Sequence, residues 1–455
     1  MPGRLRLRAA PERALGPSRG GLPRFPGALL AVAAALLLFP AGCGEADPGG
    51  DLERDPPQAP IAEISVPAVE GALQEALAET RGPARLVLAP GEHRLVPSDF
   101  VDVSCGNCED PWETVPGTLG ALISGRDIHI VGDPANPEAV VIRTGGGYGL
   151  FFEGCHGCSL EGITVTGTAR DPDDRATNGA VVARDATVRI TGCRIVDNVG
   201  DSATVASTVV GVAGIVGREG SELTVEGCRV EGNSWDGIVL YRRAEAVIRG
   251  NVVDGIESAR GAHVGGGRGV GIGLTWDARA VVEGNLVRNY WKGIGAFVDA
   301  EAVIRENVVE DVLTWGIAYW AAGEGSARAD VQGNAVFRTG ACGALLDGPD
   351  EAPREADERG PGSFTENLLV RTAQDPQYDS GEPYCSQEPI ALKGVPPGFE
   401  VRANLLHDNR HPGAAEAPEQ LGAQDFVRLA RPHLAALEQH PVLRESAFLR
   451  AYGGR

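Results

Sequence analysis

Two aspartates, Asp277 and Asp299, have the spacing in this sequence that most clearly suggests chemistry. Each follows the first apolar residue of a repeated frame by five residues, Asp277 after Ile272 and Asp299 after Ile294. If successive repeats stack as coils in register, the two carboxylates lie about 5 Å apart. At that separation one carboxyl would have a raised pKa and could act as an acid beside an ionised partner, as hydrolysis of a glycosidic bond requires. The alternative is a surface charge ladder in which Arg243 neutralises Asp277.

Other polar residues near these repeats could act in the same site. His263 lies in a glycine-rich insertion, residues 261–268, and with Arg268 it could reach over a groove, because loops on a rigid scaffold are common functional sites. The insertion is not a phosphate-binding loop, since it lacks the Lys-Ser/Thr ending. The candidate catalytic residues are therefore Asp277, Asp299, Arg243, Lys292 and His263.

Aromatic residues gather in the same part of the chain. Five of the six tryptophans lie between residues 235 and 320. Flat rings with a polar tip are suited to stacking on sugars, so this segment is the candidate binding face. Its candidate binding residues are Trp235, Tyr241, Trp276, Phe297, Tyr319 and Trp320. The alternative is that these rings, together with Trp291 and Trp315, pack inside loops or against the outer wall.

A repeat must position these residues. Between Leu150 and Asn404 a small or apolar residue, usually after glycine, is followed about half a repeat later by apolar-x-x-(Asn/Cys)-x-apolar. The pairs are Leu150 with Ile163, Ala180 with Cys193, Ile215 with Cys228, Ile238 with Asn251, Ile272 with Asn285, Ile294 with Asn307, Ile317 with Asn334, Ala344 with Asn367, and Ile390 with Asn404. The half-units alternate apolar with polar or small residues and are too short for helices, which predicts a solenoid of short strands, a parallel β-helix. The stacked asparagines would form a buried amide ladder.

Two further segments give the chain a resemblance to a known family. The first reads as a short helix at 72–77 followed by a strand and a Pro-Gly turn at 84–95, and the second, residues 123–132, resembles an early coil. With the repeats, they make residues 66–408 resemble right-handed parallel β-helix proteins of the pectate-lyase-like superfamily. The resemblance implies an all-β solenoid with a short N-terminal helical cap. It carries over no catalytic residue, because the Asp-Asp and Gly-His-Gly signatures of polygalacturonases are absent and function lives in sites rather than in folds.

The first 42 residues resemble a bacterial signal peptide, with six arginines and then an apolar run, residues 28–39, that is too short to cross a membrane. Cys43 follows a lipoprotein-like cleavage box, so we expect lipidation there, with simple secretion as the alternative. Gly44 favours the outer membrane, by resemblance to bacterial lipoproteins. The expected domains are a signal peptide at 1–42, a flexible tether at 43–65, the β-helix at 66–410, and a C-terminal helical cap over its open end at 411–455.

Eight cysteines remain after Cys43, an even number that favours disulfides in an exported chain. Two C-x-x-C units, at 105–108 and 155–158, could staple the first coils, or could bind zinc with His156. Cys193 and Cys228 occupy consecutive ladder positions at a separation compatible with a bridge, and Cys342 and Cys385 also approach one turn. The acidic run at 171–174 could bind calcium but is more often a solvated turn. No cofactor is expected, and calcium and zinc stay open as alternatives.

The charge limits the classes of partner. Loss of residues 1–42, which carry six arginines and one glutamate, would change the formal charge from −21 to −26. Nucleic acid is therefore excluded as a partner, and polyuronates are disfavoured unless a local basic patch or cation intervenes. The sequence predicts a monomeric envelope protein that contacts the membrane only through its lipid and binds a polysaccharide along residues 235–320. Whether it cleaves the polysaccharide, as a hydrolase or lyase, stays open, and a noncatalytic scaffold or adhesion-type protein is the alternative.

Overall fold

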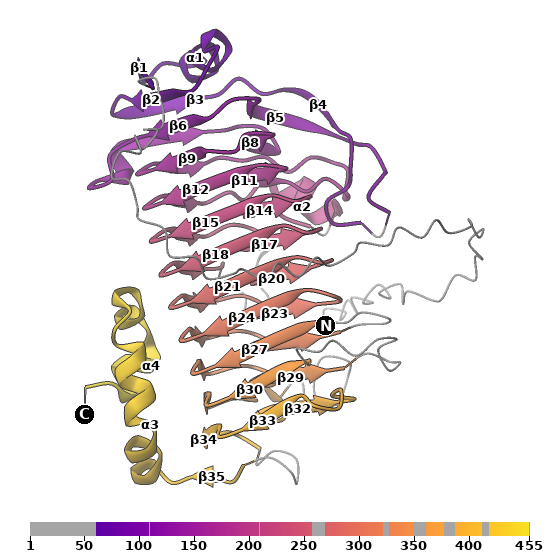
Figure 1. Cartoon of the computed structure of the whole chain (residues 1–455), viewed down its shortest axis with the longest axis vertical. Helices are drawn as coiled ribbons and strands as arrows, with labels where there is room; N and C mark the ends of the chain where they lie inside the picture. Colours follow the sequence, from indigo (N-terminus) through magenta and orange to yellow (C-terminus); the bar gives the residue numbers. More distant parts are fainter. Residues whose placement is uncertain are drawn as a thin grey trace, which may run out of the picture. The chain divides into compact units, whose positions relative to one another are not determined.

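Each repeat of the sequence forms one coil of three short strands in the computed structural model of the protein. The structure describes residues 61–108, 110–208, 210–256, 269–321, 327–348, 361–376, 387–411 and 418–454. The expected signal peptide, Cys43 and His263 lie outside the described residues. Strands at equivalent positions of successive coils pair in parallel and build three sheets, here named A, B and C (Figure 1).

Sheet A has twelve strands. They are β1 (Ala62–Val66), β2 (Ala84–Leu88), β6 (Ile128–Val131), β9 (Cys158–Glu161), β12 (Thr187–Thr191), β15 (Glu222–Glu226), β18 (Glu245–Arg249), β21 (Arg279–Glu283), β24 (Glu301–Arg305), β27 (Arg328–Gln332), β30 (Gly362–Thr365) and β33 (Glu400–Arg402). The expected tether boundary at residue 65 falls inside β1, which already pairs with β2.

Sheet B also has twelve strands, most of them three residues long. They are β3 (Gly91–Arg94), β7 (Val140–Arg143), β10 (Thr164–Thr166), β13 (Arg194–Val196), β16 (Arg229–Glu231), β19 (Val252–Asp254), β22 (Leu286–Arg288), β25 (Val308–Glu310), β28 (Ala335–Phe337), β31 (Leu368–Val370), β34 (Leu405–His407) and β35 (Gln420–Leu421).

Sheet C has eleven strands. They are β4 (Ser98–Asp102), β5 (Val115–Ser124), β8 (Tyr148–Glu153), β11 (Gly179–Arg184), β14 (Ala213–Arg218), β17 (Ile238–Tyr241), β20 (Val270–Thr275), β23 (Lys292–Phe297), β26 (Ile317–Trp320), β29 (Ala344–Asp347) and β32 (Ile390–Lys393). The hairpin of β4 and β5 is antiparallel, whereas the following strands pair in parallel. The all-β fold with helical ends that the sequence predicts is confirmed.

The asparagine ladder forms as the sequence predicts, at the tight turn between sheets A and B. Asn251, Asn285 and Asn307 are fully buried. Oδ1 of each asparagine accepts the backbone N–H of the residue one coil earlier, as Asn307 does from Asn285 at 2.9 Å. The side-chain amide donates in turn to Oδ1 of the next asparagine, as from Asn307 to Asn334 at 2.9 Å. Each amide therefore satisfies backbone groups that the turn leaves unpaired.

The glycines before the first apolar residue are required by coil stacking rather than by an unusual backbone angle. A Cβ on Gly237 would meet the carbonyl oxygen of Gly271 in the next coil and a methyl group of Val253 across the core. Equivalent contacts with the next glycine recur at Gly271 and Gly293. The frame thus selects glycine because two coils approach closely there.

Short helices flank the solenoid. They are α1 (Ala72–Glu79), α2 (Ser202–Thr208), α3 (Ala423–Leu437) and α4 (Ala447–Tyr452), with 3-10 turns η1 (Pro137–Ala139) and η4 (Pro441–Glu445). Helix α1 agrees with the expected N-terminal helix. Among the described residues, no helix is both long and apolar enough to cross a membrane.

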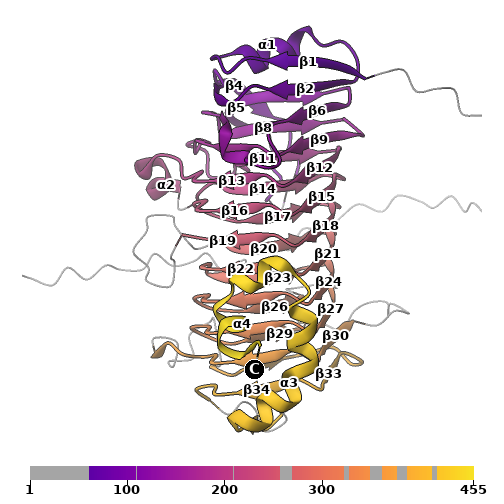
Figure 2. The same ribbon diagram turned by 90° about the vertical axis from the view of Figure 1, so that its left-hand side faces the viewer.

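The C-terminal helices cover the side of the solenoid, which corrects the expectation of a cap over its open end. Figures 1 and 2 show α3 and α4 lying along sheet B. Phe426, Leu437 and Phe448 pack against outward residues of sheet B such as Leu286 and Val308. The reason is that these strands are apolar on both faces, so their outer face also needs a cover. At the end of sheet B, β35 pairs with β34.

The helices are also held by polar contacts. Glu310, which is 1% exposed, accepts the backbone N–H groups of Ala447 and Phe448 at 3.0 Å each. Arg229 forms an ion pair with Glu445 at 3.0 Å. These contacts join the C-terminus to coils that lie far earlier in the chain.

Candidate functional site

Three of the candidate binding residues, Tyr241, Phe297 and Trp320, lie on one outward column of sheet C. Pairing places Arg184 beside Arg218, Tyr241 beside Thr275, and Phe297 beside Trp320. The column continues through Asp347 to Lys393. We call the set Arg184, Arg218, Tyr241, Thr275, Phe297, Trp320, Asp347 and Lys393 the sheet C column. It follows the solenoid axis, with about 4.8 Å between neighbouring coils.

Half-buried aromatic rings occupy the middle of this column. Phe297 and Trp320 meet edge to face with ring centres 6.2 Å apart, and Trp276, in the turn after β20, lies 6.2 Å from Tyr241. Trp315 is 2% exposed and packs behind Trp320 at 5.6 Å. The face therefore presents Trp276, Phe297 and Trp320.

Two expected binding residues occupy other positions. Tyr319 is 1% exposed and lies in the interior core against Phe399, because alternate residues of β26 face inward. The assignment of Tyr319 to the face was wrong for that reason. Trp235 lies beside the column and lines a small cavity described below.

Lys292 places a positive charge among the rings. Its Nζ lies 4.8 Å from the ring centre of Trp315, and between 5.7 and 5.9 Å from three others, those of Trp291, Phe297 and Trp320. Lys292 pairs with Val270 in the neighbouring strand, which fixes its place at the start of β23. Cation–π contact holds the ammonium group against the aromatic face.

Asp277 and Asp299 lie together in consecutive turns, as their spacing predicts. The backbone N–H of Asp277 donates to Oδ1 of Asp299 at 2.8 Å. Asp277 is exposed and adopts a left-handed backbone with φ of 60°. Burial raises the pKa of Asp299, the hydrogen bond from Asp277 opposes this shift, and the negative charge of Asp277 adds to it. A half-buried carboxyl group thus lies beside an exposed one.

Arg242, rather than Arg243, is the cation beside this pair. Arg243 is exposed and, within the described parts of the chain, forms no ion pair with Asp277. The guanidinium of Arg242 lies 4.5 Å from the ring centre of Trp276, and its charge lowers the pKa of Asp299. The charge ladder between Arg243 and Asp277 is therefore not seen.

Sequence reasoning missed Asp236, a buried carboxylate below the aromatic face. It is 6% exposed, and its Oδ1 accepts the backbone N–H of Val270 at 2.8 Å. The hydroxyl of Tyr241 donates to Oδ2 at 3.4 Å. Burial raises the pKa of Asp236 to about 6. Its signal in the sequence is an acidic residue directly before Gly237, a glycine of the repeated frame.

A segment outside the repeats covers the first part of the sheet C column, and sequence reasoning missed it too. We call residues 102–115 the strap, with Glu109 outside the described residues. The fully buried Asp102 forms ion pairs with Arg184 and Arg218, both at 2.6 Å. Although burial lowers the pKa of Arg218, Asp102 and Glu219 raise it overall, so the guanidinium stays charged.

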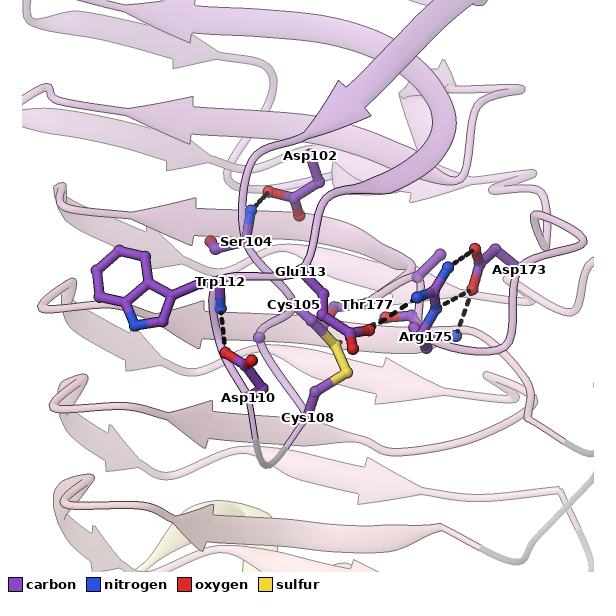
Figure 3. Close-up of a disulfide and its surroundings, with 12 residues drawn as sticks. Asp102, Ser104, Cys105, Cys108, Asp110, Trp112, Glu113, Asp173, Arg175 and Thr177 are labelled. Carbon is purple, nitrogen blue, oxygen red and sulfur yellow. Dashed lines mark hydrogen bonds and ion pairs between the residues drawn. A yellow bond between two sulfur atoms is a disulfide. The ribbon is translucent and has the colours of Figure 1, made fainter. Parts of the chain in front are cut away.

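A disulfide and one exposed ring complete the strap. Figure 3 shows the bridge between Cys105 and Cys108 and the ion pair of Arg175 with Glu113, which measures 2.7 Å. Trp112, the tryptophan outside the aromatic segment, is 84% exposed and points away from the bridge (Figure 3). The strap is thus fastened to several coils and presents one ring to solvent.

The other cysteines test the expected pairings. Cys155 bridges to Cys158 within its own unit. Cys193 and Cys228 are buried thiols, so the bridge considered between them is wrong. Each thiol instead donates to a backbone carbonyl of the preceding coil, Cys193 to Leu160 at 3.4 Å and Cys228 to Ile190 at 3.4 Å. Burial raises the pKa of Cys193 well above its ordinary value. Cys385 lies outside the described residues.

The structure does not support the metal alternatives in the part of the chain that it describes. No group of three or more His, Cys, Asp or Glu side chains converges there. Asp171 of the acidic run is 3% exposed and accepts hydrogen bonds from Thr118 and Asn178 at 2.7 Å each, which gives it a structural role. The backbone of His156 donates to Asp127, and the side chain is exposed.

A wide trough lies elsewhere, on the outer face of sheet A, with a volume of about 550 Å³. Val247, Val281 and Val303 form its floor. The charged side chains at its rim form ion pairs with one another. Arg279, for example, pairs with Glu245 and with Glu301 at 3.5 Å each. No aromatic ring lines this trough. We therefore regard the sheet C face, which combines rings with carboxylates, as the better candidate site.

Comparisons with known proteins agree with this class of fold. Residues 128–267 match the family model described as right handed beta helix region, and the chain has a right-handed parallel β-helix fold. Among solved structures, alginate lyase from Paenibacillus sp. str. FPU-7 is 16% identical, with 67% of this chain and 94% of that chain covered and a TM-score of 0.43. Pectate lyase Pel9A is 12% identical, with 64% and 79% covered and a TM-score of 0.34.

A third similar structure is the periplasmic alginate epimerase AlgG, at 12% identity, with 77% of this chain and 84% of that chain covered and a TM-score of 0.33. No curated protein matches the chain. At these identities the similarity concerns the fold alone, so the site must be judged from its own residues.

Proposed function

We propose that this protein binds a polysaccharide along the outer face of sheet C, from the turn after β20 to β29. The observation that carries the proposal is the row of half-buried rings, Trp276, Phe297 and Trp320, which follows the solenoid axis in consecutive coils. Rings at this spacing offer successive apolar platforms to an extended chain of sugar rings. Lys292 and the carboxylates beside the rings supply polar partners for sugar hydroxyls.

Hydrolysis of the bound chain is a second candidate function, and Asp299 favours it. Its raised pKa favours a proton that could pass to the glycosidic oxygen, and the exposed carboxyl group of Asp277 lies beside it as the second carboxyl that the reaction needs. The acid would protonate the leaving oxygen as the bond to the anomeric carbon breaks. The partner carboxylate would stabilise the positive charge that develops on the sugar or direct a water to it.

The binding proposal is tested with the purified protein and five defined polymers. Laminarin, xylan and dextran represent neutral chains, and alginate and polygalacturonate represent acidic chains. Binding is measured by isothermal titration calorimetry, and cleavage by the appearance of reducing ends. We expect the parent protein to bind at least one of the five polymers.

Variants locate the binding face. Trp320→Ala should weaken binding by about 1 to 3 kcal/mol, the scale of losing one aromatic contact with a sugar ring. Leu429→Ala is the control, because it removes an exposed apolar side chain from α3, which lies along sheet B and away from the sheet C column. Equal affinity of the parent and Trp320→Ala proteins would show that the polymer binds elsewhere.

We further propose that the protein is exported and anchored to the bacterial envelope through a lipid on Cys43. The proposal rests on the sequence, in which an arginine-rich start and an apolar run precede that cysteine. Cys43→Ser should move the protein from the membrane fraction to the soluble fraction and abolish labelling with a fatty-acid analogue. Unchanged fractionation and unchanged labelling would contradict it.

A further inference from the structure

The residues of the sheet C column change from arginines on the early coils to aromatic and polar residues on the later coils. On β11 and β14 its residues are Arg184 and Arg218, and both donate to the strap. From β20 to β26 the same column carries Thr275, Phe297 and Trp320. The strap therefore already occupies, on the early coils, the surface that the proposed polysaccharide would occupy on the later ones.

The boundary between the two halves lies at Arg242. Its Nε donates to the carbonyl oxygen of Gly106 in the strap at 3.2 Å, and its guanidinium lies over Trp276. One side chain thus touches both the end of the strap and the first platform. The strap is held firmly on the solenoid, because Asp102 of the strap and Arg218 of β14 form an ion pair in which both side chains are fully buried.

A small cavity of about 90 Å³ lies beside the strap. It is lined by Asn107 of the strap, by Trp235, Asp236 and Tyr241, and by Thr177. Thr177 is 8% exposed, and its hydroxyl has no hydrogen-bond partner among the described residues. A buried hydroxyl without a partner is costly, so this cavity is suited to a ligand that supplies one.

The cavity's size and charge define what it could take. Because cavities of about 150 Å³ admit a benzene ring, this smaller one has room for an exocyclic group but not for a whole sugar ring. Asp174, Asp236 and Arg175 are the charged residues of its lining, and Arg175 already forms ion pairs with Glu113 and Asp173. The two acidic residues would therefore attract a hydroxyl donor and repel a carboxylate. The group that fits is therefore a hydroxyl or hydroxymethyl group of an uncharged sugar.

We propose that the strap closes one end of the binding face and that the cavity beside it receives a hydroxyl or hydroxymethyl group of the terminal residue of a neutral polysaccharide. The protein then binds chain ends rather than the interior of the polymer. This proposal rests on the proposed function, since it requires a polysaccharide on the sheet C column. The strap sets where that chain stops.

Chain-end binding is tested with laminarin, xylan and dextran, each intact and after partial acid hydrolysis. At equal mass, chains shortened about tenfold should bind with an apparent association constant about tenfold higher, because the number of ends sets the number of sites. An association constant per unit mass that is independent of chain length would overturn the proposal. Tighter binding of alginate or polygalacturonate ends than of neutral ends would also overturn it.

Two variants probe the cavity directly. Thr177→Val keeps the shape and removes the hydroxyl, so end binding should weaken about fivefold to tenfold. Asn107→Trp should fill the cavity and abolish the dependence on chain length. Thr224→Val, a half-buried threonine on the outer face of sheet A, is the matched control and should bind like the parent protein. Thermal unfolding of each variant separates loss of the cavity from loss of the fold.

The outcomes also separate this proposal from the proposed function. If none of the polymers binds, or if Trp320→Ala has no effect on binding, the proposed function fails and chain-end binding fails with it. If Trp320→Ala weakens binding while Thr177→Val, Asn107→Trp and chain length have no effect, the polysaccharide lies on the face but its end does not lie at the strap.

Discussion

Removal of one rung of the asparagine ladder gives a direct test of what holds the coils together. In Asn307→Ala, the backbone N–H and the side-chain amide of Asn285 both lose their acceptor, Oδ1 of Asn307. The hydrogen bond from Asn307 to the carbonyl of Val282 also disappears. Each buried donor left unpaired costs about 1 to 3 kcal/mol, so two of them predict a loss of about 2 to 6 kcal/mol in the free energy of unfolding.

The assay is equilibrium unfolding in urea, followed by circular dichroism. Asn136→Ala is the matched control, because Asn136 is exposed and should change the stability by less than about 0.5 kcal/mol. Asn307→Cys should fall between the parent and Asn307→Ala, since cysteines occupy two rungs of the native ladder, Cys193 and Cys228. A stability of Asn307→Ala within about 0.5 kcal/mol of the parent would refute the view that the ladder satisfies otherwise orphaned groups.

Three further predictions concern carboxylates. Asp299→Asn should bind polysaccharide as the parent does and, if the parent releases reducing ends, should lose that release; retained turnover would exclude Asp299 as the acid. Burial raises the pKa of Asp236 from 3.8 to about 6, so the folded state binds its proton more tightly, and stability should fall by about 3 kcal/mol as pH rises from about 4 to 6. Asp236→Asn should lack this fall in stability between about pH 4 and 6. If the parent and Asp236→Asn have the same dependence of unfolding free energy on pH, the assignment to Asp236 is wrong. Asp102→Asn should lower the free energy of unfolding by about 3 to 5 kcal/mol, because it leaves the charge of the buried Arg218 poorly compensated. The strap should then become sensitive to limited proteolysis. Unchanged protease resistance would show that the ion pairs of Asp102 do not hold the strap in place.

The repeated frame was sufficient to predict the fold because each half-unit carries its own periodicity. Inward residues such as Ile272 and the ladder asparagines recur at nearly constant spacing, and stacking follows from local pattern alone. The neighbouring positions of Asp277 and Asp299 follow from the same register. The error at Tyr319 was avoidable, because alternation from Trp320 already places it on the inner side.

The strap could not be predicted in the same way, because residues 98–124 lie outside the repeats and their position depends on distant partners. Asp102 meets Arg184 and Arg218, which are 82 and 116 residues later in the sequence. Arg242 replaces Arg243 beside the acidic pair because both residues adopt left-handed angles, which turn the side chains out of simple alternation. The cover of sheet B had a signal in the sequence, since residues such as Val252 and Val253 are apolar at adjacent positions and need burial on both faces.

The C-terminal helices also bear on how this chain matures during synthesis. Leu286 and Val308 leave the ribosome more than a hundred residues before Phe426 and Phe448, which cover them in the finished protein. Until the last helix is made, a growing solenoid presents an uncovered apolar stripe along sheet B to chaperones, proteases and other nascent chains. A product that stops short of α3 would leave that stripe uncovered.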